Sequence, residues 1–268
     1  MSPSFALGLG ALAAFVAAML YTMRRETPRP DALFWILIAV ATLGAATAGA
    51  AHLGTVWQTD LSAALWISIT ASLILFAGVA LIVREAWRLA PILLIYLIAL
   101  GLLATAWGGI THGGLYGPVD AWLIVHIVVS VATYGLCTLA AVAGAAVLLR
   151  ERALRRKRPG GLGLVRRLPS VADAARLQVG LLTASEVVLA VGIATGMARQ
   201  YVLNGHLLEF DHKTLLSILA FVVIAGLLVA HRRTGLRGQR AAQVVLVGYL
   251  LLTLAYPGVK FVTDVLLA

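Results

Sequence analysis

Eight apolar runs, each close to the length of a membrane-spanning helix, occupy most of this 268-residue chain. They cover residues 5–23, 32–53, 61–83, 89–107, 121–149, 177–200, 214–230 and 241–267. A helix needs roughly 20 apolar residues to cross the hydrocarbon core, and helix is the only open-chain structure that satisfies its backbone hydrogen bonds in lipid. The sequence therefore predicts an all-α integral membrane protein with eight transmembrane helices, and residues 1–268 form a single polytopic membrane domain.

The basic residues indicate how these helices cross the membrane. Of 21 Lys and Arg residues, 18 fall in the first, third, fifth and seventh connections. Only Arg199, Lys213 and Lys260 fall on the other side. Because Lys and Arg collect in cytoplasmic loops, the odd-numbered connections are predicted to be cytoplasmic and both termini to lie on the periplasmic (outer) side. The longest connection, 150–176, is then a basic cytoplasmic loop, interpreted as a topology determinant that contacts anionic lipid, with a protein-docking or allosteric role as the alternative.

Several function classes are disfavoured by composition. The net charge of +10 is spread between the apolar runs rather than gathered on one face, as a nucleic-acid interface requires. The single cysteine, Cys137, lies inside an apolar run and excludes a disulfide framework and a CxxC redox pair. The chain has no HExxH, Walker or CxxCH motif and no Ser-His-Asp arrangement that the topology places on one surface. We therefore expect a protein that is not an enzyme.

Histidines are the informative polar residues, because ionisable groups at membrane depth are costly and usually functional. Five of the six are predicted on the outer side: His52, His112, His126, His206 and His212. His231 follows His212 by 19 residues, which in a helix places it about 28 Å away at the cytoplasmic edge. Such imidazoles could ligate haem iron, bind a transition metal with nearby carboxylates, relay protons, or only form hydrogen bonds at the interface.

His126 stands apart from the others because it lies inside an apolar run. Ser130 and Tyr134 follow it at i+4 and i+8, so all three lie on one face of the predicted helix. This pattern favours a polar pocket lined by that face over an isolated polar residue.

Four segments of the chain are similar to the cytochrome c assembly family of haem-handling membrane proteins, which includes the CcsA-like and CcmC-like proteins. Segment 117–134 resembles the part of the family that carries an external haem-ligating histidine with a tyrosine eight residues later. Segment 210–214, Phe-Asp-His-Lys-Thr, resembles the end of a signature that docks haem, but lacks its tryptophans. Segment 230–238 resembles the element with an intramembrane haem histidine, and 255–261 resembles the last helix. The best match covers residues 117–268, and the short Asp-His-Lys-Thr form is closest to the HemX-like branch.

This resemblance implies a protein that binds non-covalent, b-type haem and presents or transports it at the bacterial inner (plasma) membrane for cytochrome c biogenesis. It implies His126 and His212 as first candidates for iron ligands and His231 as an intramembrane haem ligand. Lys213 and Arg199 are candidate partners of the haem propionates, and His52 could complete a site. The expected partners are haem, the lipid bilayer and other cytochrome c assembly or respiratory membrane proteins, and no nucleic acid.

Two other functions stay open at this level. The first is a regulatory or chaperone-like membrane partner of tetrapyrrole synthesis or of a respiratory complex, without stable haem, because the tryptophans of the signature are missing. The second is a transporter that uses the histidine-lined pocket. A transporter would be expected to hold acidic residues inside its spans, where only Glu186 and Asp264 are candidates.

Overall fold

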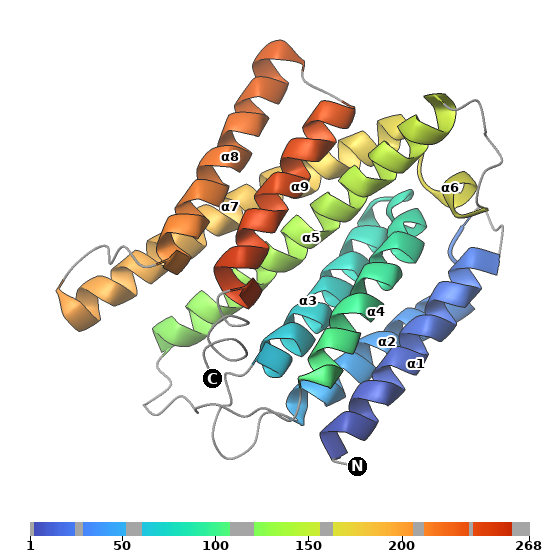
Figure 1. Cartoon of the computed structure of the whole chain (residues 1–268), viewed down its shortest axis with the longest axis horizontal. Coiled ribbons are helices and arrows are strands. Elements are labelled where there is room, and N and C mark those ends of the chain that lie inside the picture. Colours follow the sequence, from blue (N-terminus) through green and yellow to red (C-terminus); the bar gives the residue numbers. More distant parts are fainter. Residues whose placement is uncertain are drawn as a thin grey trace.

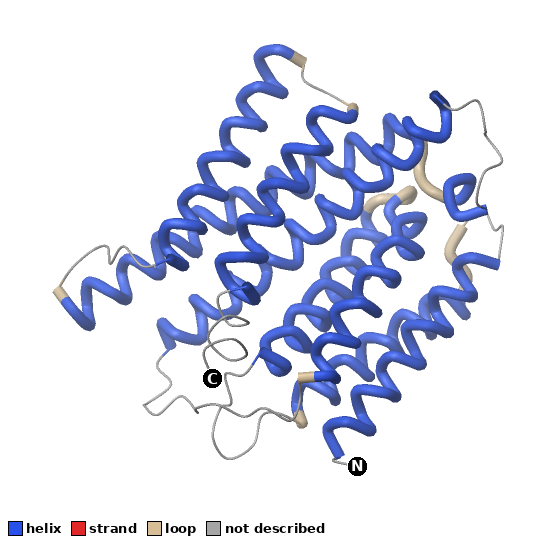
Figure 2. The backbone as a smooth tube through the Cα atoms, in the orientation of Figure 1, coloured by secondary structure: helices blue, strands red, loops and turns tan. Residues whose placement is uncertain are grey.

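The computed structural model describes residues 3–24, 29–51, 61–107, 121–155, 163–205, 212–235 and 238–258. Within these ranges every regular element is a helix (Figure 2). The elements are α1 (Pro3–Arg24), α2 (Ala32–Ala50), α3 (Leu61–Ile82), a short 3₁₀ turn η1 (Ala86–Leu89), α4 (Ala90–Ala106), α5 (Ala121–Arg155), α6 (Gly163–Arg167), α7 (Val171–Asn204), α8 (His212–Thr234), α9 (Gln239–Thr253) and a π turn η2 (Leu254–Gly258). The predicted all-α class is confirmed.

Seven of the described helices are long and apolar enough to cross a membrane: α1, α2, α3, α4 together with η1, α5, α7 and α8. The eighth predicted span, 241–267, begins as α9 and is described only as far as Gly258. The structure therefore supports a multi-pass membrane protein, and the count of eight spans stays a prediction.

Consecutive long helices run in opposite directions (Figure 1). The starts of α1, α3, α5 and α8 lie at one end of the bundle with the ends of α2, α4, α7 and α9 (Figure 1). The opposite end carries basic residues in the last turns of three helices, namely Arg24 of α1, Arg155 of α5 and Arg233 of α8. This grouping agrees with the alternation expected from the charges, while the outer location of the termini stays a prediction.

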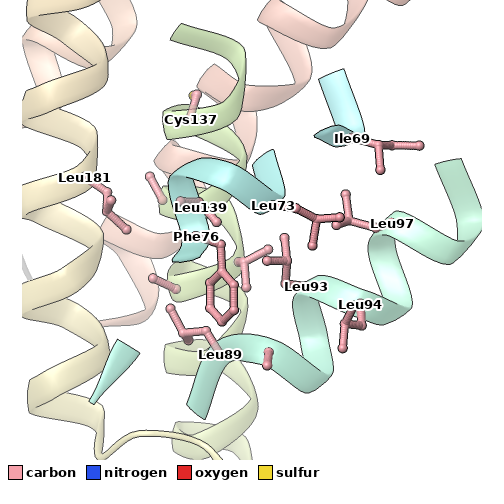
Figure 3. Packing of buried hydrophobic residues seen from close by; sticks show 14 of the residues in the cluster. Ile69, Leu73, Phe76, Leu89, Leu93, Leu94, Leu97, Cys137, Leu139 and Leu181 are labelled. Atoms are coloured by element: carbon pink, nitrogen blue, oxygen red, sulfur yellow. The ribbon is translucent and has the colours of Figure 1, made fainter. Parts of the chain in front are cut away.

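Helices α1 to α4 pack mainly on one another and form one group, while α5, α7, α8 and α9 form a second (Figure 1). Helix α5 joins the groups because it packs against α3 and α4 as well as α7 and α9. Figure 3 shows apolar side chains meeting across this junction, among them Phe76 of α3, Leu93 of α4 and Leu139 of α5. All three side chains are buried, so α5 is the central helix of the fold.

Trp66 of α3 fills the centre of the first group and is only 1% exposed. Glycines on the three neighbouring helices lie against it. A Cβ placed on Gly8 of α1 or on Gly101 of α4 would lie 3.4 Å from the indole, and one on Gly49 of α2 would lie 3.5 Å from the Trp66 Cβ. The four helices therefore surround one large aromatic side chain.

Helices α5 and α7 extend beyond the apolar runs that predicted them. α5 has 35 residues and α7 has 34, so at 1.5 Å per residue each is about 50 Å long, whereas the hydrocarbon core is roughly 30 Å thick. Much of segment 150–176, predicted as a loop, is helical: α5 continues to Arg155, α6 follows, and α7 begins at Val171. Ser170 caps α7 by accepting a hydrogen bond from the Asp173 backbone N–H at 3.1 Å.

Arginines fold the α6 segment back onto the bundle. The Arg150 guanidinium donates hydrogen bonds to the backbone carbonyls of Arg166, Leu168 and Pro169. Arg167 donates to the Thr22 carbonyl near the end of α1 at 3.2 Å. The connection between α5 and α7 is therefore tied to both helix groups.

Candidate functional site

The antiparallel pair α5 and α7 positions the candidate site. Contacts along the pair keep one register, because each step toward the end of α5 is matched, to within one residue, by a step toward the start of α7. The contacting pairs are His126 with Gly196, Val129 with Gly192, Cys137 with Ser185, and Gly144 with Gln178. The small residues allow close approach of the two helices, as is usual for helix pairs in membranes.

His126 lies at this interface near the start of α5 and is partly buried. A Cβ on Gly196 would lie 3.1 Å from Cε1 of the His126 ring, which is closer than ordinary van der Waals contact. Any side chain at position 196 would therefore displace the imidazole, and glycine there lets the ring lie against the α7 backbone.

A hydrogen bond orients the His126 ring. Its Nδ1 lies 3.3 Å from the Thr195 hydroxyl oxygen, and that hydroxyl donates its own proton to the Gly192 carbonyl at 3.0 Å. Since the Thr195 proton is already used, the oxygen accepts and His126 Nδ1–H donates. In this assignment Nε2 carries the free lone pair, which is the form of imidazole that binds a metal ion.

Arg199 belongs to the same face of α7. Gly192, Thr195, Gly196 and Arg199 are spaced i, i+3, i+4 and i+7, so they form one stripe along the helix. The Arg199 guanidinium is close enough to act electrostatically on the His126 ring. The structure thus brings together two of the predicted site residues, a histidine and a cation suited to an acidic group.

The other predicted site residues either lie partly or wholly outside the described structure or lie far from His126. His212 and Lys213 are the first two residues of α8, and their side chains lie outside the described part of the structure. His52 also lies outside the described residues. His231 is in the last turn of α8, at the opposite end of that helix from His212. His231 therefore belongs to a different region of the protein from the start of α8.

Tyr134 does not share a pocket with His126. Its hydroxyl lies 3.2 Å from that of Tyr96 on α4 and 3.1 Å from that of Tyr249 on α9. Tyr96 and Tyr249 also bond each other, and Thr138 donates to Tyr249 at 3.0 Å. We call these four residues the tyrosine cluster. The face of α5 that carries His126 and Tyr134 therefore packs against different helices along its length. His126 contacts α7, whereas Tyr134 contacts α4 and α9.

Residues of the stripe on α7 were missed from the sequence. Thr195 and Gly196 are ordinary residues for an apolar run. The signal in the sequence is their i+3 and i+4 spacing from Gly192, which places all three on one face of a helix. The antiparallel register that places them against His126 depends on packing between segments about 70 residues apart.

We expect Thr195→Val to destabilise the protein modestly, by about 0.5–1.5 kcal/mol, because it removes the acceptor of the His126 ring. The measurement is thermal unfolding in mild detergent. Thr183→Val is the matched control, since the Thr183 hydroxyl on the same helix bonds only to the Val179 carbonyl among the hydrogen bonds described. Equal losses in the two variants would contradict the role given to Thr195.

The fold and the site define a class: a multi-pass helical membrane protein with an oriented histidine at the interface of its two longest helices. The chain belongs to the cytochrome c assembly protein family, whose model matches residues 32–267. The match begins at the start of α2 and so includes α2, α3 and α4, which precede segment 117–268.

One curated relative comes from Azospirillum brasilense and bears the name "Uncharacterized 28.8 kDa protein in nifR3-like 5'region". It is 49% identical over 275 aligned positions, which cover 100% of both chains. No solved structure matches the chain.

Proposed function

We propose that this protein binds haem in the membrane and presents or transports it for cytochrome c biogenesis, without being an enzyme itself. Membership of the cytochrome c assembly family suggests a role in cytochrome c biogenesis. The observation that carries the haem-binding part is the His126 imidazole, with its Nδ1 on Thr195 and Nε2 left as a lone-pair donor.

The chemistry of the residues around His126 supports an iron porphyrin as the ligand. Haem iron takes neutral imidazole nitrogen as an axial ligand, and a hydrogen bond on the other ring nitrogen fixes the tautomer that ligation needs. Arg199 on the adjoining stripe of α7 supplies a cation that can pair with a propionate. Non-covalent, b-type haem is the form proposed, because the chain has no CxxCH attachment motif.

His212 is proposed as the second iron ligand, with Lys213 as a further propionate partner. Support comes from their position at the start of α8, which Figure 1 shows at the same end of the bundle as the start of α5. His52, which lies outside the described residues, is kept as a candidate that could complete the site. His231 is proposed for a second haem position, because it lies at the far end of α8.

The cellular setting is part of the proposal. The basic helix ends support an orientation with the His126 end outside and the Arg-rich end in the cytoplasm, in the inner (plasma) membrane of a bacterium. The short segment 210–214 supports placement near the HemX-like branch of the family. The proposed protein partners are other cytochrome c assembly or respiratory membrane proteins.

Spectroscopy of the purified protein tests this function. In mild detergent we expect a Soret band and sharp reduced α and β bands of low-spin haem, with a pyridine haemochrome assay to count haem per chain. His126→Ala combined with His212→Ala is expected to abolish haem at the outer site, because both proposed iron ligands are removed.

His112→Ala is the control, because it removes a histidine predicted on the same side but not assigned to the site. If the double variant keeps the wild-type number of haems per chain, His126 and His212 are excluded as the ligands. A protein that is colourless, and stays so after hemin is added, would contradict haem binding altogether and favour the regulatory or chaperone-like function.

A further inference from the structure

A second ionisable group, Glu186, lies in the interior of the bundle and has no place in the proposed haem site. It is 15 residues after the start of α7 and 18 before its end, so each end of the helix is more than about 20 Å away. The residue is 8% exposed, and both carboxyl oxygens are buried without a hydrogen-bond partner among the residues that the structure describes. An unsatisfied buried polar group of this kind calls for an explanation.

Among the α7 side chains that the structure describes, none compensates for the carboxyl. The residues one turn away on the same face are Leu182, Thr183, Leu189 and Ala190. The only polar one, Thr183, donates its hydroxyl to the Val179 carbonyl at 2.8 Å. The neighbouring Ser185 donates to the Leu182 carbonyl at 3.0 Å. The charged residues of α7 whose side chains are described, Asp173, Arg176 and Arg199, are at least ten positions away.

The helices packed against α7 also provide no described hydrogen-bond partner for the Glu186 carboxyl. From α5 the titratable group facing Glu186 is the buried Cys137 thiol, which bonds to Ser185. On α9, the Tyr249 hydroxyl forms its hydrogen bonds within the tyrosine cluster. Arg240 lies in the first turn of α9, at one end of that helix. The basic side chains described on α8 are those in its last turn, His231, Arg232 and Arg233. None of these groups hydrogen-bonds to either Glu186 oxygen.

An ionised carboxylate in this position would be buried in an apolar interior without a partner. That cost is far larger than the cost of burying a neutral carboxylic acid, and a buried group in such surroundings neutralises instead. Ionisable residues placed inside membrane spans are commonly proton carriers or members of relays.

We propose that Glu186 is a proton-binding site in the membrane interior, occupied by a proton in the conformation described here. The ligand is H⁺, held on a carboxyl oxygen next to the Cys137 and Ser185 pair. Release of this proton requires the α5–α7 interface to open to water or to a cation. Glu186 is therefore protonated while α5 and α7 are packed together.

Infrared spectroscopy and carbodiimide labelling test the proposal on the full chain in detergent. The C=O stretch of a protonated carboxyl is separate from that of a carboxylate, and we expect the wild-type protein to show it and Glu186→Gln to lose it. Dicyclohexylcarbodiimide, which attacks protonated carboxyls in apolar surroundings, is expected to modify Glu186 in a digest read by mass spectrometry.

Asp173→Asn is the matched control. Asp173 lies on the same helix, but its carboxylate bonds to Ser170 in the exposed first turn, so this variant is expected to keep both the infrared band and the labelling. Glu186→Leu is expected to melt at or above the wild-type temperature, because a neutral acid without partners contributes no ion pair.

The proposal is overturned if the band persists in Glu186→Gln, or if Glu186 resists the carbodiimide. Labelling that sodium or potassium ions abolish would also overturn it, since it would indicate a bound cation in place of the proton. If Glu186→Gln fails to fold, labelling of the wild-type protein decides alone. None of these readouts depends on haem, so they stand apart from the test of the proposed function.

Discussion

Replacing Trp66 with alanine is expected to lower the free energy of unfolding by about 3–5 kcal/mol, the largest effect of any single substitution proposed for this protein. Trp66 is 1% exposed and lies against glycines of α1, α2 and α4. Alanine would leave a cavity that these backbones cannot fill without moving. Thermal unfolding in mild detergent, followed by circular dichroism, measures the loss.

Trp122→Ala is the control for this experiment. Trp122 is 50% exposed at the start of α5, as expected of an aromatic residue at the membrane interface. Its replacement should change stability by no more than about 0.5 kcal/mol. Similar losses at positions 66 and 122 would show that Trp66 is not the centre of the first helix group.

Tyr249→Phe is expected to cost about 1–3 kcal/mol, because it removes one hydrogen-bond partner from each of three buried or half-buried hydroxyls. Tyr96, Tyr134 and Thr138 each bond to the Tyr249 oxygen. The ring contacts should survive, since phenylalanine retains the aromatic packing on Tyr96 and Tyr134 at centroid distances of 6.0 and 5.6 Å. The measurement is again the unfolding midpoint in detergent.

Tyr201→Phe provides the comparison, because Tyr201 is 57% exposed near the end of α7. The side chain is exposed, so the substitution should be close to neutral. A neutral result for Tyr249→Phe as well would mean that the tyrosine cluster does not hold α9 and α4 to α5.

The sequence predicts helix positions well because the bilayer imposes them. Runs of about 20 apolar residues with basic flanks leave few alternatives, and α2, α3 and α4 begin and end close to the predicted limits. The long ends of α5 and α7 were missed, since polar residues such as Arg152 and Asp173 interrupt the apolar pattern without interrupting the helix. The end of an apolar run marks where the chain leaves the hydrocarbon core, and the helix can continue beyond that point.

Contacts between helices could not be predicted from the sequence in the same way. His126 stood out as a polar residue in an apolar run, but its partner Thr195 lies 69 positions later and is one of several threonines in the chain. The sequence does not single out Trp66, because its burial against glycines of three other helices depends on how the helices pack. Helix register in a membrane follows from small residues that let backbones approach, and one sequence does not show which small residues face each other.

The tyrosine cluster also has a consequence for the order in which the protein is assembled. Tyr96 and Tyr249 are 153 residues apart, and the ribosome delivers the N-terminal helices to the membrane first. Until the ninth helix arrives, Tyr96 and Tyr134 have only each other within the cluster, and Thr138 has only the Tyr134 carbonyl. Helix α9, which is synthesised after α4 and α5, thus completes the hydrogen bonds of Tyr96, Tyr134 and Thr138. A chain truncated before α9 would enter the bilayer without these contacts.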